Sequence, residues 1–441
     1  MDWNQLLSTK RFGLEAYHEP HKDDRSTFQR DFDRLIFSAP FRRLQNKTQV
    51  FPLPGSIFVH NRLTHSLEVS CVGRSLGNDV AKALIEKEPT LKKSHVQEIG
   101  TIVSAACLAH DMGNPPFGHS GEKAISTYFS EGKGLYLKSR LTAEEWDDLI
   151  HFEGNANAFR LLTHQFKGRR KGGFALTYPT LAAIVKYPYS AQLAGEKSKF
   201  GFFKSEKADF ATVANHLGML CVQKEPLRYA RHPLVYLVEA ADDICYQLMD
   251  IEDAHKLKIL TTEETKALFM AFLDEHRLQR TLEVFKMVED INEQIVYLRS
   301  IVIGILIGEC VTTFMEHEEE FLAGTRTTPL MESITARSRK AYQDCSTTAF
   351  AKIYRSKEVL DVELAGYRIV TTLLDGLIEA VTSPDKAYSK LLIGRISSQY
   401  QIDAPTLYGK IQAVLDFISG MTDIYALDLY RKINGNSLPA I

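Results

Sequence analysis

The sequence predicts a mainly α-helical protein, all-α in class, with at most a few short strands. Apolar residues recur at helical spacing through long stretches, whereas the alternating pattern of a half-buried strand is scarce. Of the 441 residues, 44% are hydrophobic and 24% are charged, which gives enough apolar material for a large core. The sequence shows no internal repeat at a fixed period, so a solenoid is not expected.

Long helices follow one another along most of the chain. The spacing of apolar residues predicts them, with ends placed to within about 2 to 4 residues, over 61–87, 96–111, 142–164, 208–222, 232–252, 262–318, 356–382 and 405–434. We expect several of these helices to be broken. Segments 167–173 and 193–207 are rich in Gly, Lys and Ser and predict loops, which could contain short strands. A division near residue 325 separates a core domain, 1–325, from a helical C-terminal region, 326–441, packed on that core.

The charge and cysteine content limit the class of ligand and the cellular compartment that we expect. Lys and Arg number 53 against 55 Asp and Glu, so an anionic ligand must be held by local basic clusters rather than by a global positive field. The six cysteines are scattered, and the N-terminus lacks the charged and apolar segments of a secretory signal. The most apolar run, 300–308, is too short to span a bilayer. We therefore expect a reduced, cytoplasmic protein without a membrane segment.

The most informative motif runs from His110 to Glu122. It reads His-Asp-Met-Gly-Asn-Pro-Pro-Phe-Gly-His-Ser-Gly-Glu and follows an apolar helix. Counting from Ile99 by four, three and four residues reaches His110, so the imidazole projects from the buried face of that helix. Gly113 suits a helix terminator, and the prolines that follow prevent the helix from continuing. His110 and Asp111 therefore lie where a helix opens into a rigid loop, a common position for ligand-binding residues.

Two further predicted helices carry side chains that suit a metal. His65 lies on the apolar stripe of the helix 61–87 and so points inward. Asp242, Tyr246 and Asp250 fall at i, i+4 and i+8, within one arc of their helix. Two imidazoles and two carboxylates arriving from three helices would make a divalent-metal site, because nitrogen and oxygen donors suit Mg, Mn, Fe, Ni or Zn. Spacing alone does not pair residues more than 170 positions apart.

Plainer interpretations stay open for several of these residues. A single histidine on an apolar helix face is more often a core residue than a ligand, and Asp243 could face the metal in place of its neighbour. Glu122 near a helix start is also a favourable partner of the helix dipole. Arg42, Arg43 and Lys47 form a basic cluster that could touch phosphate, an effector or nucleic acid, although a solvated face is the default interpretation.

The order of these motifs resembles the HD phosphohydrolase signature of His, then His-Asp, then Asp. A longer set of blocks, in order from about residue 28 to 432, is similar to the bacterial dGTP triphosphohydrolases. One departure is Ile424, which stands where members of that family often carry Arg. The blocks are Ser38-Ala-Pro-Phe-Arg-Arg-Leu-Gln-Asn-Lys-Thr-Gln-Val-Phe, Asn61-Arg-Leu-Thr-His-Ser, the His110 motif, Phe152-Glu-Gly-Asn, Glu239-Ala-Ala-Asp-Asp-Ile and Ser419-Gly-Met-Thr-Asp-Ile-Tyr-Ala.

The resemblance implies an HD-domain fold, a metal and a reaction. The family's four ligands match His65, His110, Asp111 and Asp242. They would hold one divalent metal per site, Mg or Mn first, with Ni, Fe, Co or Zn as alternatives. The family reaction is hydrolysis of a deoxynucleoside triphosphate, dGTP favoured, at the α-phosphorus, which releases the deoxynucleoside and intact tripolyphosphate.

The resemblance also implies proton-transfer and substrate residues. His119 and Glu122 lie three apart at the opening of a helix, so Glu122 can orient His119 as a general acid or base. Arg62 and Lys186 would meet phosphate; the ring of Tyr246 would stand where a ribose 2′-OH would clash. Asp250 and Gln45 would meet the 3′-OH, and His151 would approach the leaving side. The implied substrate contacts are Gln45, Arg62, His151, Lys186, Tyr187, Tyr246 and Asp250.

Two other functions stay open at this point. One is another HD phosphohydrolase, acting on a nucleoside monophosphate or a guanosine tetraphosphate alarmone. The other is a nucleotide-sensing or single-stranded DNA-binding scaffold whose metal is structural. Relatives in the family commonly form symmetric oligomers and some respond to nucleotides or single-stranded DNA, so we expect a homo-oligomer, a hexamer or tetramer, with a dNTP or single-stranded DNA effector.

Overall fold

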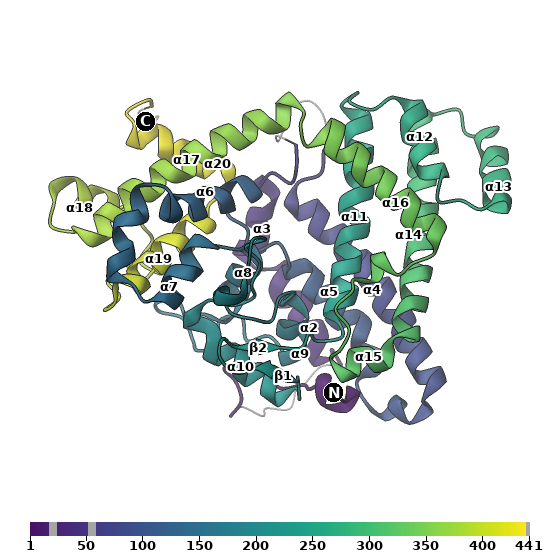
Figure 1. Cartoon of the computed structure of the whole chain (residues 1–441), viewed down its shortest axis with the longest axis horizontal. Coiled ribbons are helices and arrows are strands. Elements are labelled where there is room, and N and C mark those ends of the chain that lie inside the picture. Colours follow the sequence, from purple (N-terminus) through teal and green to yellow (C-terminus); the bar gives the residue numbers. More distant parts are fainter. Residues whose placement is uncertain (17–23, 52–58, 438–441) are drawn as a thin grey trace.

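The chain folds into a mainly helical structure, as predicted, with one small β-hairpin among the described residues (Figure 1). The computed structural model describes residues 1–16, 24–51 and 59–437. The hairpin pairs β1 (Cys221–Gln223) antiparallel to β2 (Arg228–Tyr229). It lies outside the loops in which the sequence allowed strands, because Gly218, with φ of +67°, ends the preceding helix early.

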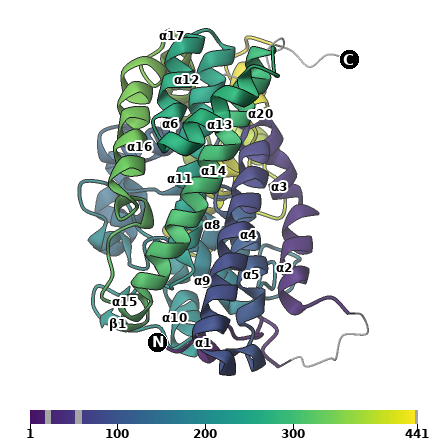
Figure 2. The same ribbon diagram turned by 90° about the vertical axis from the view of Figure 1, so that its right-hand side faces the viewer.

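One layer of helices is built around a central pair. α4 (Arg62–Lys87) and α5 (Ile99–Ala109) pack along each other, and α2 (Thr27–Ile36) covers α5. α11 (Val235–Lys256) and α14 (Ile291–Glu316) both pack on α4, as Figure 2 shows for α14. A continuous cluster of buried apolar side chains surrounds these helices.

A second apolar cluster lies beside the first. It is formed by α6 (His119–Ser130), α7 (Ala143–Ile150), α17 (Lys357–Thr382), α19 (Leu407–Ser419) and α20 (Asp423–Ile433). In Figure 1, α17 runs along the top of the molecule from α16 toward α18. The segment between α5 and α6 joins the two clusters. The motif from His110 to Glu122 therefore lies at their junction.

Several predicted helices are broken where a side chain caps a new one. The segment 142–164 divides into α7 and α8 (Gly154–Thr163), because the Glu153 carboxylate accepts hydrogen bonds from two backbone amides at the start of α8. Thr422 likewise caps α20 and divides 405–434. Apolar spacing continues across such breaks, so it does not reveal them. The segment 262–318 divides in the same way into α12 (Thr262–Met270), α13 (Glu275–Phe285), α14 and α15 (Glu318–Ala323).

The remaining helices are mostly short, and the sequence did not predict most of them. The predicted helix 208–222 ends at His216, and 96–111 begins with a single 3₁₀ turn. The helices not yet named are α1 (Trp3–Leu6), α3 (Ala39–Arg43), α9 (Tyr178–Ile184), α10 (Lys207–His216), α16 (Ala336–Thr348) and α18 (Ala387–Ile393). The division of the chain near residue 325 stays a prediction.

α14 is longer than its most apolar run suggested. Within the described residues it is the one helix long and apolar enough to cross a membrane by length and composition. Of its most apolar window, 28% is buried, and Ile295, Leu298, Val302 and Leu306 face the interior, where the helix packs on α4, α11 and α12. The same length and composition are found in core helices of soluble proteins.

Candidate active site

His65 is held at the start of α4 by a capping box. The Asn61 side chain accepts a hydrogen bond from the Thr64 amide at 3.0 Å, and the Thr64 hydroxyl accepts one from the Asn61 amide at 3.1 Å. The helix therefore begins one turn before His65. Its side chain is 2% exposed, which confirms that this histidine points inward.

His110 ends the α5 helix with one ring nitrogen fixed and the other free. Nδ1 donates to the Cys107 carbonyl at 2.6 Å, since a carbonyl can only accept. Nε2 is buried and makes no hydrogen bond among the described residues. A buried imidazole nitrogen that makes no hydrogen bond is free to bind a cation, and carboxylate oxygens of Asp242 and Asp111 lie 3.5 and 3.7 Å from it.

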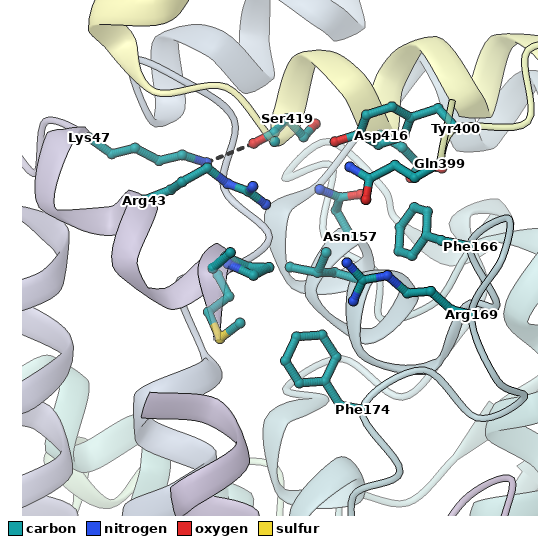
Figure 3. Close-up of a pocket in the computed structure, with 15 residues that line it drawn as sticks. Arg43, Lys47, Asn157, Phe166, Arg169, Phe174, Gln399, Tyr400, Asp416 and Ser419 are labelled. Carbon is teal, nitrogen blue, oxygen red and sulfur yellow. Dashed lines mark hydrogen bonds between the residues drawn. The ribbon is translucent and has the colours of Figure 1, made fainter. Parts of the chain in front are cut away.

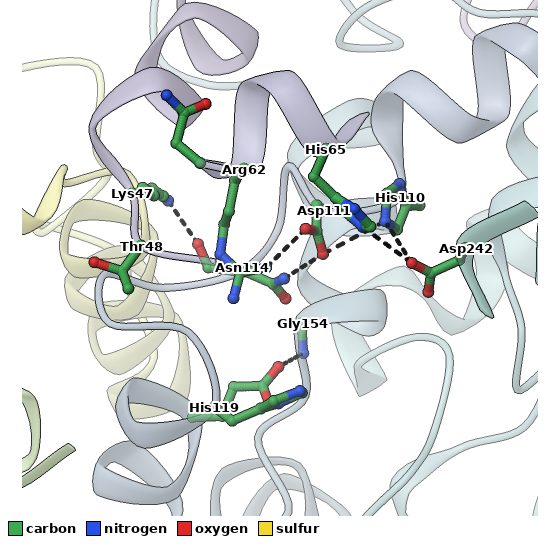
Figure 4. A network of polar contacts seen from close by, with 12 residues as sticks. Lys47, Thr48, Arg62, His65, His110, Asp111, Asn114, His119, Gly154 and Asp242 are labelled. Carbon is green, nitrogen blue, oxygen red and sulfur yellow. Dashed lines mark hydrogen bonds and ion pairs between the residues drawn. The ribbon is translucent and has the colours of Figure 1, made fainter. Parts of the chain in front are cut away.

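Asp111 is oriented by two donors. Arg62 Nη1 lies 2.7 Å from Oδ2, and Asn114 Nδ2 lies 2.5 Å from Oδ1. The ligand atoms of His65, His110 and Asp111 lie within 4.8 Å of one another, a spacing that could hold a metal ion. Figure 4 shows these three side chains pointing toward one another.

Asp242 reaches the same point from α11. Its Oδ1 lies 3.1 Å from His65 Nε2 and 3.5 Å from His110 Nε2. Three helices thus bring two imidazoles and two carboxylates together, and His110 Nε2 lies at ion-pair distance from both carboxylates without a hydrogen bond (Figure 4). The donor set and the His110 nitrogen without a hydrogen bond both fit a divalent cation.

The charges of this cluster are strongly coupled. Burial alone would raise the pKa of Asp242, but His110 and His65 hold it well below its ordinary value. Burial would lower the pKa of His110, but Asp111 and Asp242 raise it to about 9. A proton shared by this cluster therefore competes with a cation for the same atoms.

His119 and Glu122 form a pair at the start of α6. Glu122 Oε2 accepts from His119 Nδ1 at 2.8 Å, and its Oε1 accepts from the Gly154 amide at 2.8 Å. The Glu122 carboxylate raises the pKa of His119. Burial would raise the pKa of Glu122, but His119 lowers it, together with Lys199. The His119 side chain is 76% exposed, so its ring can exchange protons while Glu122 fixes its orientation.

Lys199 and Glu153 support this pair, and the sequence did not single them out. Lys199 Nζ lies 2.8 Å from Glu153 Oε1, beside the buried carboxylate of Glu122. Burial and the charge of Glu122 raise the pKa of Glu153. The lysine thus balances two neighbouring buried carboxylates. Glu153 belongs to a quoted block, but Lys199 comes from a loop without a motif.

The position of Gly113 in the sequence suggested a helix terminator. The structure does not show a left-handed terminating conformation at this residue. α5 ends at Ala109, and Gly113 is not among the residues with positive φ. A Cβ at Gly113 would lie 2.1 Å from the Ala158 amide and 2.2 Å from the Gly154 carbonyl. The glycine is needed because the turn packs directly against the backbone of α8.

The residues predicted to contact the sugar, Tyr246 and Asp250, lie further along α11, against a tyrosine from the C-terminal part of the chain. Tyr246 and Tyr354 stack with ring centroids 6.0 Å apart. The Tyr354 hydroxyl donates to Asp250 Oδ2 at 2.7 Å. Burial raises the pKa of Asp250 to about 8, although the Tyr354 hydrogen bond opposes that rise. The sequence pattern did not point to Tyr354.

The predicted phosphate contacts differ in how close they lie to the cluster. Lys186 lines a small pocket together with His110 and Asp242, and its Nζ lies 3.1 Å from Glu239 Oε1. The ring of Tyr187 lies 5.8 Å from the same ammonium. Arg62 is buried in its ion pair with Asp111.

Gln45 and His151 are not brought into the cluster by any contact within the described part of the chain. Gln45 is exposed in a 3₁₀ turn, and His151 Nδ1 lies 2.9 Å from the Ser198 hydroxyl. Burial lowers the pKa of His151. Their roles toward substrate stay predictions.

The C-terminal region is tied to the motif loop by Asp423 and Lys47. Asp423 Oδ1 accepts from the Phe117 amide at 2.8 Å, and Oδ2 accepts from the Thr48 amide and hydroxyl at 2.7 and 2.6 Å. Lys47 Nζ donates to the carbonyls of Asn114 and Ser419, at 2.6 and 2.7 Å. Lys47 is 2% exposed, so the interpretation of a fully solvated basic face was wrong at this residue.

Comparison with known proteins defines the class and then the family. The chain matches two family models, the HD domain over residues 62–181 and the phosphohydrolase-associated domain over 333–432, and is thus an HD-domain phosphohydrolase. It is 38% identical to a deoxyguanosinetriphosphate triphosphohydrolase-like protein of Pseudomonas aeruginosa, over 100% of both chains. A protein of Synechocystis sp. with the same description is also 38% identical, over 99% of this chain and 100% of its own. The deoxyguanosinetriphosphate triphosphohydrolase of Yersinia enterocolitica is 29% identical, over 98% and 99%. The chain belongs to the dGTP triphosphohydrolase-like family.

Proposed function

We propose that this protein hydrolyses deoxynucleoside triphosphates, dGTP first among them, at the α-phosphorus to the deoxynucleoside and tripolyphosphate. The observation that carries the proposal is the group of His65, His110 and Asp111, joined by Asp242, with a His110 nitrogen that makes no hydrogen bond among the described residues. The names of the full-length relatives support dGTP as the substrate.

The four residues of the cluster would hold one divalent metal, Mg or Mn first. A metal bound there supplies positive charge for the phosphate and for the charge that develops in the transition state. Asp242 is the ligand on α11 rather than Asp243, since the imidazoles of His65 and His110 both lie against Asp242. Arg62 fixes the Asp111 carboxylate toward the cluster.

Proton transfer belongs to His119. Its Nδ1 is held by Glu122, so Nε2 can give a proton to the leaving 5′-oxygen or take one from water. The water oxygen forms the new bond to the α-phosphorus, the bond from that phosphorus to O5′ breaks, and the 5′-oxygen leaves protonated. Lys186, which lines the pocket beside the cluster, supplies charge for the phosphates.

Tyr246 and Asp250, on the later turns of α11, would select deoxyribose. The ring of Tyr246 is backed by Tyr354 and would leave no room for a 2′-OH. Asp250 would accept from the 3′-OH on the oxygen that the Tyr354 hydroxyl does not occupy.

The test is incubation of the purified chain with each of the four dNTPs and with GTP, in Mg or Mn, with products separated by anion-exchange chromatography. We expect tripolyphosphate and free deoxynucleoside, with dGTP turned over fastest and GTP spared. Release of pyrophosphate and a nucleoside monophosphate, or turnover of monophosphates or alarmones alone, would contradict the proposal. Asp242→Ala serves as the inactive control in the same assay.

A further inference from the structure

A separate pocket lies behind the motif turn, between α3, the loop after α8 and α19. Its cavity volume is about 60 Å³. This is well above the roughly 10–15 Å³ that a cavity needs to hold one water molecule, so the pocket has room for a small group. Met112 and Asn157 line it from the motif side, and none of the four cluster residues does. Figure 3 shows Arg43, Lys47 and Arg169 around it, with Phe166, Gln399 and Tyr400 as further walls.

The pocket has more positive charge than its own residues compensate. Arg43 and Arg169 make no ion pair or side-chain hydrogen bond with any described residue. The one carboxylate in the lining, Asp416, is occupied by Arg160, whose Nε and Nη2 lie 2.8 Å from its two oxygens. Two unpaired guanidinium groups therefore face the cavity against a carboxylate that is already paired. The Lys47 ammonium lies beside them, and burial lowers its pKa to about 7, although the charge of Asp423 opposes that shift.

Two of the three groups are withdrawn from solvent, whereas Arg169 is exposed. Lys47 is 2% exposed and Arg43 is half-buried. Burial lowers the pKa of Arg43, and the nearby charge of Arg169 adds to that effect. An arginine remains charged under these conditions, so partial burial without a counterion costs free energy that a bound anion would recover.

Part of the lining is held in place by contacts within the chain. Two of the three N–H groups of Lys47 donate to the Asn114 and Ser419 carbonyls, which leaves the third for a ligand. Phe166 and Tyr400 pack edge to face, with ring centroids 5.9 Å apart and planes at 90°. The unpaired guanidinium groups beside these fixed residues suit the tetrahedral oxygens of a phosphoryl group.

We propose that this pocket is a second anion site, which binds a phosphoryl group through Arg43, Lys47 and Arg169. The phosphoryl group belongs either to an inorganic phosphate or to a nucleotide, since both present the same oxygens to the same donors. The site does not depend on the metal cluster, so the proposal stands apart from the proposed hydrolysis.

The experiment is isothermal titration of the full chain with inorganic phosphate and, separately, with deoxyguanosine monophosphate. We expect Arg43→Gln and Arg169→Gln each to weaken binding by about tenfold or more, because each removes a charge-assisted hydrogen bond. The matched controls are Arg42→Gln and Arg170→Gln, neighbours in sequence that do not line the pocket, and these should bind as the wild type does. Asp242→Ala should also keep this binding.

Three results would overturn the proposal. They are no binding of either anion by the wild type at millimolar concentration, equal losses in the control variants, and loss of all binding in Asp242→Ala. Thermal unfolding without ligand identifies a variant that fails to fold. If Arg43→Gln fails to fold, Arg169→Gln still tests the proposal, because Arg169 is exposed. Equal affinity for the two anions shows that the phosphoryl group alone accounts for binding, so the site is assigned to inorganic phosphate. Tighter binding of deoxyguanosine monophosphate assigns the site to nucleotides.

Discussion

The two ends of the site on α11 differ in what holds their carboxylates. Asp242 lies between two imidazoles, which keep its pKa well below the ordinary value and the carboxylate ionised. Asp250, two turns later, has a tyrosine hydroxyl as its partner, and burial raises its pKa to about 8. One end therefore suits the cation, and the other suits the neutral hydroxyl, that the proposed function assigns to them. The same residue type suits both proposed roles because its neighbours differ.

The largest expected effect comes from breaking the cation-binding end. Asp242→Ala should lose the metal and lower kcat/KM by more than about 1000-fold, since positive charge at the phosphate is worth several kcal/mol. Metal content by mass spectrometry and turnover check both parts. Asp243→Ala is the matched control; retention of metal in Asp242→Ala together with loss in Asp243→Ala would reverse the assignment.

Substitutions in the pair of His119 and Glu122 should lower turnover without loss of metal. His119→Ala should keep the wild-type metal content and lower kcat by about 10²- to 10⁴-fold, because only proton transfer is removed. Glu122→Gln, which keeps the shape but loses the charge, should lower kcat less. Equal loss of metal in His119→Ala and Asp242→Ala would contradict the separation of the two roles.

At the sugar end, the expected effect is smaller. Tyr354→Phe keeps the ring against Tyr246 but removes the donor to Asp250, so KM for the deoxynucleotide should change by about 2- to 12-fold, the worth of one hydrogen bond. Removal of a donor to the carboxylate raises the pKa of Asp250 further, so the pH dependence of KM should move to higher pH. An unchanged KM at every pH would show that Tyr354 does not act on this end.

The smallest effect concerns Asp148, a buried carboxylate in the second apolar cluster that also accepts from a tyrosine, Tyr408. Burial raises its pKa to about 8 in the folded chain, above the unfolded value of 3.8. The folded state therefore binds the extra proton, and stability falls as pH rises from about 4 to 8. In Asp148→Asn this loss is absent, so its Tm relative to the wild type should rise by about 2 °C or more between pH 5 and 8.5. A Tm difference that does not change with pH would show that Asp148 is ionised in the folded chain.

The sequence predicted the parts of the site that depend on local order, and missed those that depend on distant segments. The helical class, the inward positions of His65 and His110 and the loop after α5 all follow from apolar spacing and from glycine and proline. The meeting of Asp242 with the two histidines needed the family resemblance, because no local signal joins positions 177 residues apart. Tyr354 and Lys199 could not be predicted, since their place beside the site depends on packing of α16, α17 and a long loop.

Some parts of the account stay predictions for physical reasons. The base that the site prefers depends on contacts to a bound nucleotide. Homo-oligomer formation, as a hexamer or tetramer, and a dNTP or single-stranded DNA effector depend on surfaces between chains. The helix breaks, by contrast, are visible in hindsight, because Glu153, Asp274, Asp290 and Thr422 are capping residues inside continuous apolar patterns.

The most direct test of the central claim is hydrolysis of dGTP in water labelled with ¹⁸O, with mass spectrometry of both products. Attack of water on the α-phosphorus predicts one labelled oxygen in the tripolyphosphate and none in the deoxyguanosine. Label in the deoxyguanosine, or labelled deoxyguanosine monophosphate with pyrophosphate as the other product, would contradict the reaction that these residues are proposed to carry out.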